Sequence, residues 1–273
     1  MMLRPALLAA CLFLVANAFA QSPPADNKLP ARVSQGAMVI GHANPGSTVS
    51  VDGRTLRVDA DGRFVFGVGR DEKGPLTVSI QSTGNAAQTI RIEVTPRDWP
   101  IQRINGVPPS TVNPPPKIAE RIARENGQIV AARKANSAST DFAKTFIWPV
   151  QGRISGRFGN QRIYNGTPKS YHSGMDIAAG TGTPIHAPAG GTITLAQKDF
   201  YLTGGTVMID HGHGIGSNFL HMSRLDVKVG DVVKQGDVIG AVGSTGRSTG
   251  PHLHWGMSWF DTRIDPLLVL PAK

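Results

Sequence analysis

Short runs of alternating hydrophobic and polar residues, separated by turn signals, occupy the chain between residues 35 and 98. Two of the turn signals, Asp52-Gly53 and Asp61-Gly62, are dipeptides that favour tight β-hairpins. The alternation predicts a small antiparallel β-sandwich. The expected strands are Ala37–Ile40, Thr48–Val51, Thr55–Val58, Phe64–Val68, Leu76–Ile80 and Thr89–Val94.

The pattern changes over residues 99–145, which we expect to form a connector between two β-rich parts. The run from Trp99 to Pro116 is rich in proline and is therefore expected to be extended and semi-rigid. From Lys117 onward, isoleucines recur at helical spacing, which predicts a short helix. Gly127 lies within this segment and is expected to fray or bend the helix.

Strand-like runs return at Phe146 and continue to the C-terminus, with glycines at nearly every bend. The pattern shows no helix of normal length here, so residues 146–273 are expected to form a compact antiparallel β domain. The chain as a whole is therefore predicted to be all-β, with one short helical linker. The principal expected strands of this domain are Thr192–Ala196, Thr206–Ile209, Gly216–Leu220, Val238–Val242 and His252–Met257.

The first twenty residues have the pattern of a secretory signal peptide. Arg4 supplies a positive start, an apolar run follows, and Ala18-Phe19-Ala20 is a small-x-small cleavage site. The apolar run is shorter than a bilayer-spanning helix requires, which argues against a stable membrane span. We therefore expect cleavage after Ala20, export to the periplasm, and a flexible leader over residues 21–34. A lipoprotein cleavage site at Cys11 is less favoured, because the apolar run continues past that cysteine.

Composition narrows the range of partners. Lysine and arginine total 28 against 19 aspartate and glutamate residues, which gives a formal net charge of +9. A basic exported protein is suited to an anionic polymer such as the cell wall. The sequence lacks the aromatic–basic interleaving typical of nucleic-acid binding, so no nucleic-acid partner is expected.

Cys11 is the only cysteine, so the mature chain is expected to depend on its core, or on a metal, for stability.

Candidate chemistry is concentrated in three short motifs, His172–Asp176, Asn218–His221 and His252–His254. Alternate side chains of a strand share a face, so His252 and His254 are expected to point the same way. His172, Asp176 and one histidine of that pair make the three-ligand set of a catalytic zinc site, with a fourth position open. The other histidine of the pair and His221 would then serve proton transfer, since the imidazole pKa lies near neutral pH.

Two more histidines, His211 and His213, lie in the Gly-rich turn Asp210–Gly214. Their spacing does not group them with the other candidates. We interpret them as turn residues that support the site without binding metal.

A series of glycine- and histidine-rich stretches occurs in a characteristic order along the C-terminal half. They are Ser155–Gly159, His172–Ala178, Gly182–Pro184, Asp210–Gly212, Phe219–Ser223, Val229–Asp231, Gly236–Gly240, Gly243–Gly246 and Gly250–His254. With these stretches, residues 146–267 resemble the lysostaphin-like, or LytM-type, zinc endopeptidases that cut bacterial cell-wall peptides. The preceding β region is similar to an N-terminal domain found with this peptidase in exported Gram-negative proteins.

The resemblance implies a role for each candidate residue. It makes His172, Asp176 and His254 the ligands of one zinc ion per chain, and His221 and His252 the catalytic histidines. It also implies an antiparallel sheet with a narrow zinc groove, and peptidoglycan as the substrate. The Gram-negative architecture suggests a D,D-endopeptidase acting on D-alanyl–diaminopimelate cross-links. A cell-wall amidase or another wall-remodelling protein is a candidate partner.

One position departs from the family pattern, and two other interpretations stay open. Relatives often carry tyrosine where this chain has Phe219, so a hydroxyl that could hold the oxyanion is missing. A LytM-type factor that binds the wall or activates an amidase would keep the fold without hydrolysis, although the complete set of site residues favours an enzyme. Val227–Gly240 resembles the hairpin of biotinyl or lipoyl carriers, but it lacks the modified lysine at its tip.

Overall fold

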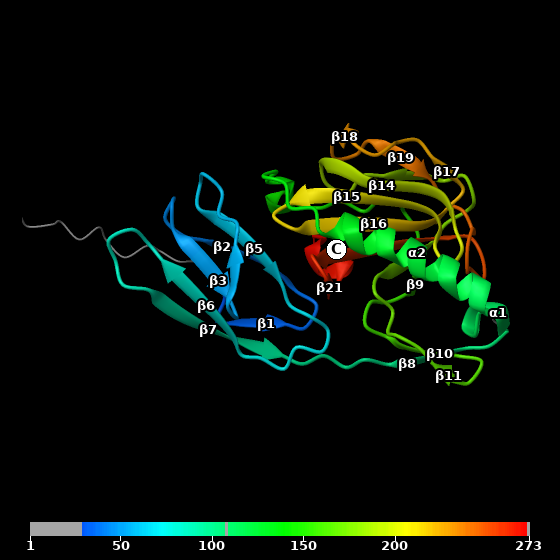
Figure 1. Cartoon of the computed structure of the whole chain (residues 1–273), viewed down its shortest axis with the longest axis horizontal. Helices are drawn as coiled ribbons and strands as arrows, with labels where there is room; N and C mark the ends of the chain where they lie inside the picture. Colours follow the sequence, from blue (N-terminus) through cyan, green and yellow to red (C-terminus); the bar gives the residue numbers. More distant parts are fainter. Residues whose placement is uncertain (1–28, 107–108, 272–273) are drawn as a thin grey trace, which may run out of the picture.

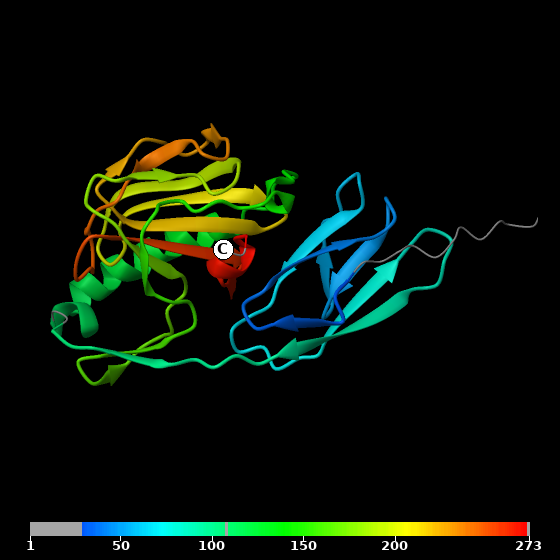
Figure 2. The same ribbon diagram turned by 180° about the vertical axis from the view of Figure 1, so that it is seen from behind.

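The computed structural model describes residues 29–106 and 109–271. Two β-rich parts lie side by side along the long axis of the molecule, and a helix lies along the larger of them (Figures 1 and 2). The predicted signal peptide, residues 1–20, lies outside the described residues, as does most of the predicted leader. Among the described residues, no helix combines the length and the apolar character needed to span a bilayer.

The smaller, N-terminal part contains a five-stranded sheet of order β1-β7-β6-β3-β4 and the two-stranded pair β2-β5. The alternation of the sequence explains its core, because Leu76, Val78 and Ile80 of β6 are buried while the residues between them are more exposed. Phe64 and Phe66 of β5 are fully buried beside them. The strands are β1 Arg32–Ser34, β2 Met38–His42, β3 Thr48–Val51, β4 Arg54–Leu56, β5 Arg63–Gly67, β6 Leu76–Gln81 and β7 Gln88–Thr95.

The first of these strands differs from the sequence prediction, which placed residues 21–34 in a flexible leader. Arg32–Ser34 forms β1 and runs parallel to β7, with Val33 opposite Val94. A three-residue edge strand has too little alternation of its own to be detected, since its pairing depends on the neighbouring strand. Arg32–Ser34 therefore belongs to the sheet.

The connector is extended over Ile101–Ile104, where it is also hydrogen-bonded into a sheet, but Pro109–Val112 forms the helical turn α1 where the proline content predicted an extended chain. β8, Ile101–Ile104, pairs in parallel with β10, which brings the connector onto the second β-rich part. The helix α2, Pro116–Arg133, continues through Gly127. Ile129 packs against Leu195 and Phe200 of the large sheet, and this contact supports the helix beyond the glycine. The other helical turns are α1 Pro109–Val112, η1 Asp141–Ala143 and η2 Pro266–Val269.

The larger, C-terminal part is built on one sheet of order β18-β14-β15-β16-β20-β12-β9, with β21 beside β20. All pairings described within this sheet are antiparallel, which agrees with the predicted all-β class. The strands are β9 Arg153–Gly156, β10 Gln161–Tyr164, β11 Thr167–Pro168, β12 Met175–Ala178, β13 Pro184–His186, β14 Gly191–Phe200, β15 Gly204–Gly212, β16 Ile215–Met222, β17 Arg224–Leu225, β18 Val232–Val233, β19 Val238–Ala241, β20 His252–Trp259 and β21 Thr262–Ile264.

The two parts are packed directly against each other through the end of the C-terminal sheet. The Asp265 backbone N–H donates to the Gly36 carbonyl oxygen (2.8 Å), and the Arg97 guanidinium pairs with the Asp265 carboxylate (2.9 Å). Arg54 of β4 lies over the rings of Trp259 and Phe260. These contacts fix the N-terminal part on the sheet that carries the candidate site.

Candidate metal centre and active-site cleft

Three of the predicted site residues meet at one point between β12 and β20. Asp176 of β12 lies directly opposite His254 of β20 in the antiparallel register, and His172 enters from the loop before β12. His172 Nε2 is 2.9 Å from His254 Nδ1 and 3.0 Å from Asp176 Oδ1, and His254 Nδ1 is 2.9 Å from the same oxygen. All three residues are buried. The site thus presents two nitrogens and one oxygen in a compact triangle.

The chemistry of these donor atoms fits a cation. His172 Nδ1 lies 2.9 Å from the Arg157 carbonyl oxygen, and because a carbonyl can only accept, this nitrogen carries the proton. The neutral ring then presents a lone pair at Nε2, as metal-bound histidines do. His254 Nε2 is buried and has no hydrogen-bond partner among the described residues, which suits a ring that carries its proton there and offers Nδ1 to a metal.

Burial and hydrogen bonding set the ionisation of this triangle. Burial would raise the pKa of Asp176, but the adjacent rings of His172 and His254 outweigh it and hold that pKa well below its usual value. Burial lowers the pKa of His254 to about 3. An ionised carboxylate and a neutral imidazole are the forms that bind metal, and these are the forms that the two shifts favour for Asp176 and His254.

The other two predicted residues, His221 and His252, stand beside the triangle. Their ring centroids are 4.8 Å apart, and His252 Nε2 is 3.8 Å from Asp176 Oδ1. His221 Nδ1 donates to the Thr245 carbonyl oxygen and His252 Nδ1 donates to the Gly250 carbonyl oxygen, each at 2.8 Å. In its neutral form, each ring therefore carries its lone pair at Nε2. Burial lowers the pKa of His221 to about 4, which keeps this ring neutral.

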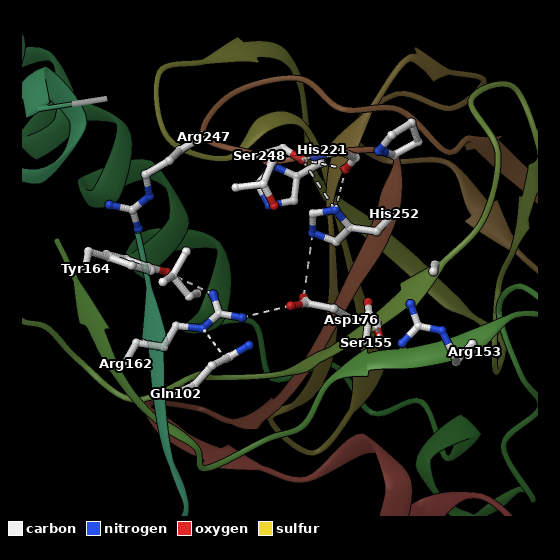
Figure 3. Close-up of a pocket in the computed structure, with 15 residues that line it drawn as sticks. Gln102, Arg153, Ser155, Arg162, Tyr164, Asp176, His221, Arg247, Ser248 and His252 are labelled. Carbon is white, nitrogen blue, oxygen red and sulfur yellow. Dashed lines mark hydrogen bonds and ion pairs between the residues drawn. The ribbon is translucent and has the colours of Figure 1, made fainter. Parts of the chain in front are cut away.

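A cleft of about 300 Å³ opens over these residues (Figure 3). The connector supplies part of its wall through Gln102 and Ile104 of β8, and the hairpin strand β10 supplies Arg162 and Tyr164. Arg162 was not identified from the sequence. Its guanidinium lies 2.8 Å from Asp176 Oδ2, so it holds the carboxylate oxygen that is not part of the triangle.

Two glycines of the quoted motifs permit the close packing of the centre. A methyl group at Gly156 would overlap Asp176 Oδ2 and would lie 3.1 Å from His172 Cε1. A methyl group at Gly174 would lie 2.7 Å from His254 Nε2. These close approaches explain why glycine occupies both positions. The place of Gly174 between His172 and Asp176 is a sequence signal for it, whereas Gly156 lies far from the candidate ligands in the sequence.

The remaining histidines and Phe219 lie outside the triangle. His211 is fully buried, with Nδ1 2.6 Å from the Gly190 carbonyl oxygen and Nε2 2.8 Å from Ser217 Oγ. His213 contacts the ring of Phe142. Phe219 is fully buried in the core and does not line the cleft. The lack of a tyrosine hydroxyl at this position therefore removes no group from the cleft wall.

The sequence and the fold were compared with known proteins. Residues 170–266 match the sequence profile of Peptidase family M23. A crystal structure from Pseudomonas aeruginosa, described as a peptidase M23, is 31% identical and covers 88% of this chain and 95% of that chain, with a TM-score of 0.66. This likeness extends over both β-rich parts.

Two bacterial relatives match a little under half of the chain. The DD-carboxypeptidase/endopeptidase Mpg of Neisseria meningitidis serogroup B is 45% identical over 125 residues, 45% of this chain and 27% of the relative. The peptidoglycan DD-endopeptidase ShyA of Vibrio cholerae is 38% identical over 111 residues, 40% of this chain and 26% of the relative. The chain spans between about a quarter and just over a third of the length of the curated relatives it matches.

Proposed function

The chain belongs to peptidase family M23, and on this premise we propose that it is a zinc-dependent endopeptidase that hydrolyses peptide cross-links of bacterial peptidoglycan. The triangle of His172, Asp176 and His254 carries this proposal, because it offers three buried donor atoms of the kind that catalytic zinc sites use. The similarity to relatives named for D,D-peptidase activity supports a D,D cross-link as the bond that is cut.

In this proposal His172, Asp176 and His254 hold one zinc ion. When bound, zinc supplies Lewis acidity and positive charge beside the scissile carbonyl. Arg162 positions the Asp176 carboxylate through the ion pair on Oδ2. The cluster is buried beneath the cleft, so the ligands are shielded from bulk water while the cleft gives access to substrate.

His221 and His252 move protons in the proposed reaction. The lone pair at Nε2 of either ring can accept the proton of the attacking water, since both Nδ1 atoms are committed to backbone carbonyls. Once protonated, the same nitrogen can donate to the oxyanion or to the leaving amine. The backbone bonds to Thr245 and Gly250 hold the rings in the tautomer that this requires.

Mass spectrometry of muropeptides tests this function. Purified protein is incubated with zinc and isolated peptidoglycan, and we expect cross-linked dimers to be converted to monomers. His172→Ala is expected to lose both bound zinc and hydrolysis, whereas His252→Ala keeps zinc and loses roughly 10²–10⁴-fold in rate. His186→Ala removes a histidine outside the cleft and serves as the matched control. A His172→Ala variant that keeps stoichiometric zinc and full hydrolysis would refute the ligand assignment.

The same assay separates the enzyme from a non-hydrolytic factor. Wild-type protein that binds one zinc ion but leaves every cross-link intact would indicate a wall-binding protein or an amidase activator. Addition of a purified wall amidase to that reaction would then reveal stimulation.

We also propose that the chain is exported to the periplasm by a signal peptide cleaved after Ala20. The support is the pattern of residues 1–20, together with a substrate that lies outside the cytoplasm. Intact mass measurement of protein from the periplasmic fraction is expected to give a chain that begins at Gln21. A chain that begins at Cys11 and carries lipid would favour the lipoprotein alternative instead.

A further inference from the structure

The three predicted zinc ligands are not held equally firmly. Asp176 and His254 face each other on the paired strands β12 and β20, whereas His172 lies in the loop before β12. A side chain on a loop is placed less precisely than one on a strand, so its position depends on the contacts around it. The residues that hold this loop therefore bear on the geometry of the whole triangle.

His172 is held by residues 157–160, the turn that connects β9 to β10. Its Nδ1 donates to the Arg157 carbonyl oxygen (2.9 Å), and its backbone N–H donates to the Asn160 carbonyl oxygen (2.8 Å). The Gly159 N–H donates to the His172 carbonyl oxygen (2.8 Å). Turn 157–160 thus holds both the ring and the backbone of this ligand.

The N-terminal part contacts this turn through Arg70, which lies between β5 and β6. Arg70 Nε donates to the Gly159 carbonyl oxygen (2.7 Å), and the side chain of Arg70 is only 12% exposed. Its guanidinium also lies over the ring of Tyr171, 4.8 Å from the ring centre. Because the N–H of Gly159 bonds to His172, the two backbone groups of this glycine connect Arg70 to the ligand.

A second contact with the N-terminal part fixes the same glycine. The ring of Trp99 packs so closely on Gly159 that a methyl group there would lie 2.0 Å from it, and the φ of Gly159 is +83°, which favours glycine. Trp99 Nε1 donates to Gln35 Oε1 (3.0 Å), and Gln35 is buried in the N-terminal part. Packing and hydrogen bonding therefore both restrict the position of Gly159.

We propose that Arg70 is a positioning residue for the metal centre, because its bond to the Gly159 carbonyl oxygen keeps His172 where zinc binding requires it. The N-terminal part thereby raises the zinc affinity of a site whose ligands all lie in the C-terminal part. Groups that orient a metal ligand typically contribute 10- to 100-fold in affinity. Arg70 acts through Gly159, so we expect an effect of roughly 10-fold, at the lower end of that range. The inference rests on the zinc site of the proposed function and deepens it.

Two substitutions of similar length isolate the hydrogen bond. In Arg70→Gln the side-chain amide nitrogen takes the place of Nε and can still donate, whereas Arg70→Met puts a methyl group there. Competition with a chromogenic chelator gives the zinc dissociation constant. We expect it to rise roughly 10-fold in Arg70→Met and to stay close to the wild-type value in Arg70→Gln.

Hydrogen exchange of the zinc-free protein gives a second readout. The N–H groups of Gly159 and His172 should exchange faster in Arg70→Met than in the wild type or in Arg70→Gln, because the turn opens more often. Arg70→Lys keeps the charge but moves the donor one atom farther along the side chain. It is expected to give an intermediate loss of zinc affinity, and it carries the test if Arg70→Met does not fold.

Arg54→Met is the matched control. Arg54 also joins the two parts, but it does so over the rings of Trp259 and Phe260 and not at turn 157–160. Its loss should leave the zinc dissociation constant unchanged, and circular dichroism checks the fold of every variant.

Three results would overturn the inference while the peptidase function stands. They are wild-type zinc affinity in a folded Arg70→Met protein, an equal loss in Arg70→Gln, and an equal loss in Arg54→Met. A wild-type protein that binds no zinc and cuts no isolated peptidoglycan would refute the proposed function itself, and the inference with it.

Discussion

Substitution of Gly156 by alanine should weaken zinc binding without unfolding the sheet. The new methyl carbon would overlap Oδ2 of Asp176 and lie 3.0 Å from its Cγ, whereas carbon atoms pack at about 3.5–4.0 Å. The carboxylate must therefore retreat by roughly 0.5–1 Å. Metal–ligand distances in protein sites tolerate only about 0.2 Å. The backbone of Gly156 is outside the left-handed region, so the effect comes from the side chain alone.

The expected loss is roughly 10- to 100-fold in zinc affinity, the range seen when a group that orients a metal ligand is disturbed. Movement of Oδ2 would also strain its ion pair with Arg162. Competition with a chromogenic chelator gives the zinc dissociation constant, and circular dichroism checks the fold. Gly180→Ala is the matched control, because its methyl group meets only Thr183 Oγ1, at 3.8 Å. Wild-type zinc affinity in a folded Gly156→Ala protein would refute the claim that the carboxylate has no room to adjust.

Three further predictions concern the surroundings of the site. Thr245→Val removes two side-chain hydrogen bonds that anchor the loop holding His221, each worth about 0.5–1.5 kcal/mol. We expect kcat to fall roughly 3- to 30-fold while bound zinc is retained. A wild-type kcat in this variant, or an equal loss in the control Thr183→Val, would contradict the prediction. Burial lowers the pKa of His211, so the unfolded chain takes up the proton first as the pH falls, and the free energy of unfolding decreases below about pH 6.5. In urea titrations of zinc-free protein, His211→Gln should reduce the dependence of the free energy of unfolding on pH by up to about 1.4 kcal/mol per pH unit. An unchanged dependence would show that His211 does not titrate differently in the folded and unfolded states. In Gly127→Ala the new methyl group lies in open space beside α2, so the free energy of unfolding should rise by about 0.8–1 kcal/mol without a change in kcat. A lower melting temperature would contradict the helix contacts described.

The sequence carried enough information to predict most strands, because half-buried strands alternate. In β20 the alternation that was expected to put His252 and His254 on one face leaves Leu253 and Trp255 on the other, and both of these are fully buried. It could not distinguish His252 from His254. That distinction comes from the pairing of β12 with β20, which sets His254 directly opposite Asp176. Register between strands far apart in sequence leaves no local signal, so only the fold shows it.

The connector is a second case in which pairing between segments far apart in the sequence could not be predicted from the local pattern. Its proline content predicted an extended chain, which holds for Ile101–Ile104 but not for the helical turn at Pro109–Val112. The parallel pairing of Ile101–Ile104 with β10 depends on residues about sixty positions away. That pairing carries Gln102 to Arg162 and Ile104 into the cleft wall. Long-range contacts of this kind arise from tertiary packing, which propensity and alternation do not encode.

The candidate metal centre and the shape of the cleft are therefore encoded in different segments of the chain. The metal triangle, His221 and His252 all fall within residues 170–266, the segment that matches the family profile. Several wall residues fall before it, including Gln102, Arg162 and Tyr164. Tyr164 stacks under Arg247, so residues outside the matched segment orient a group inside it. The shape of the cleft can thus change with the connector and the β10 hairpin, while the geometry of the triangle set by β12 and β20 stays as it is.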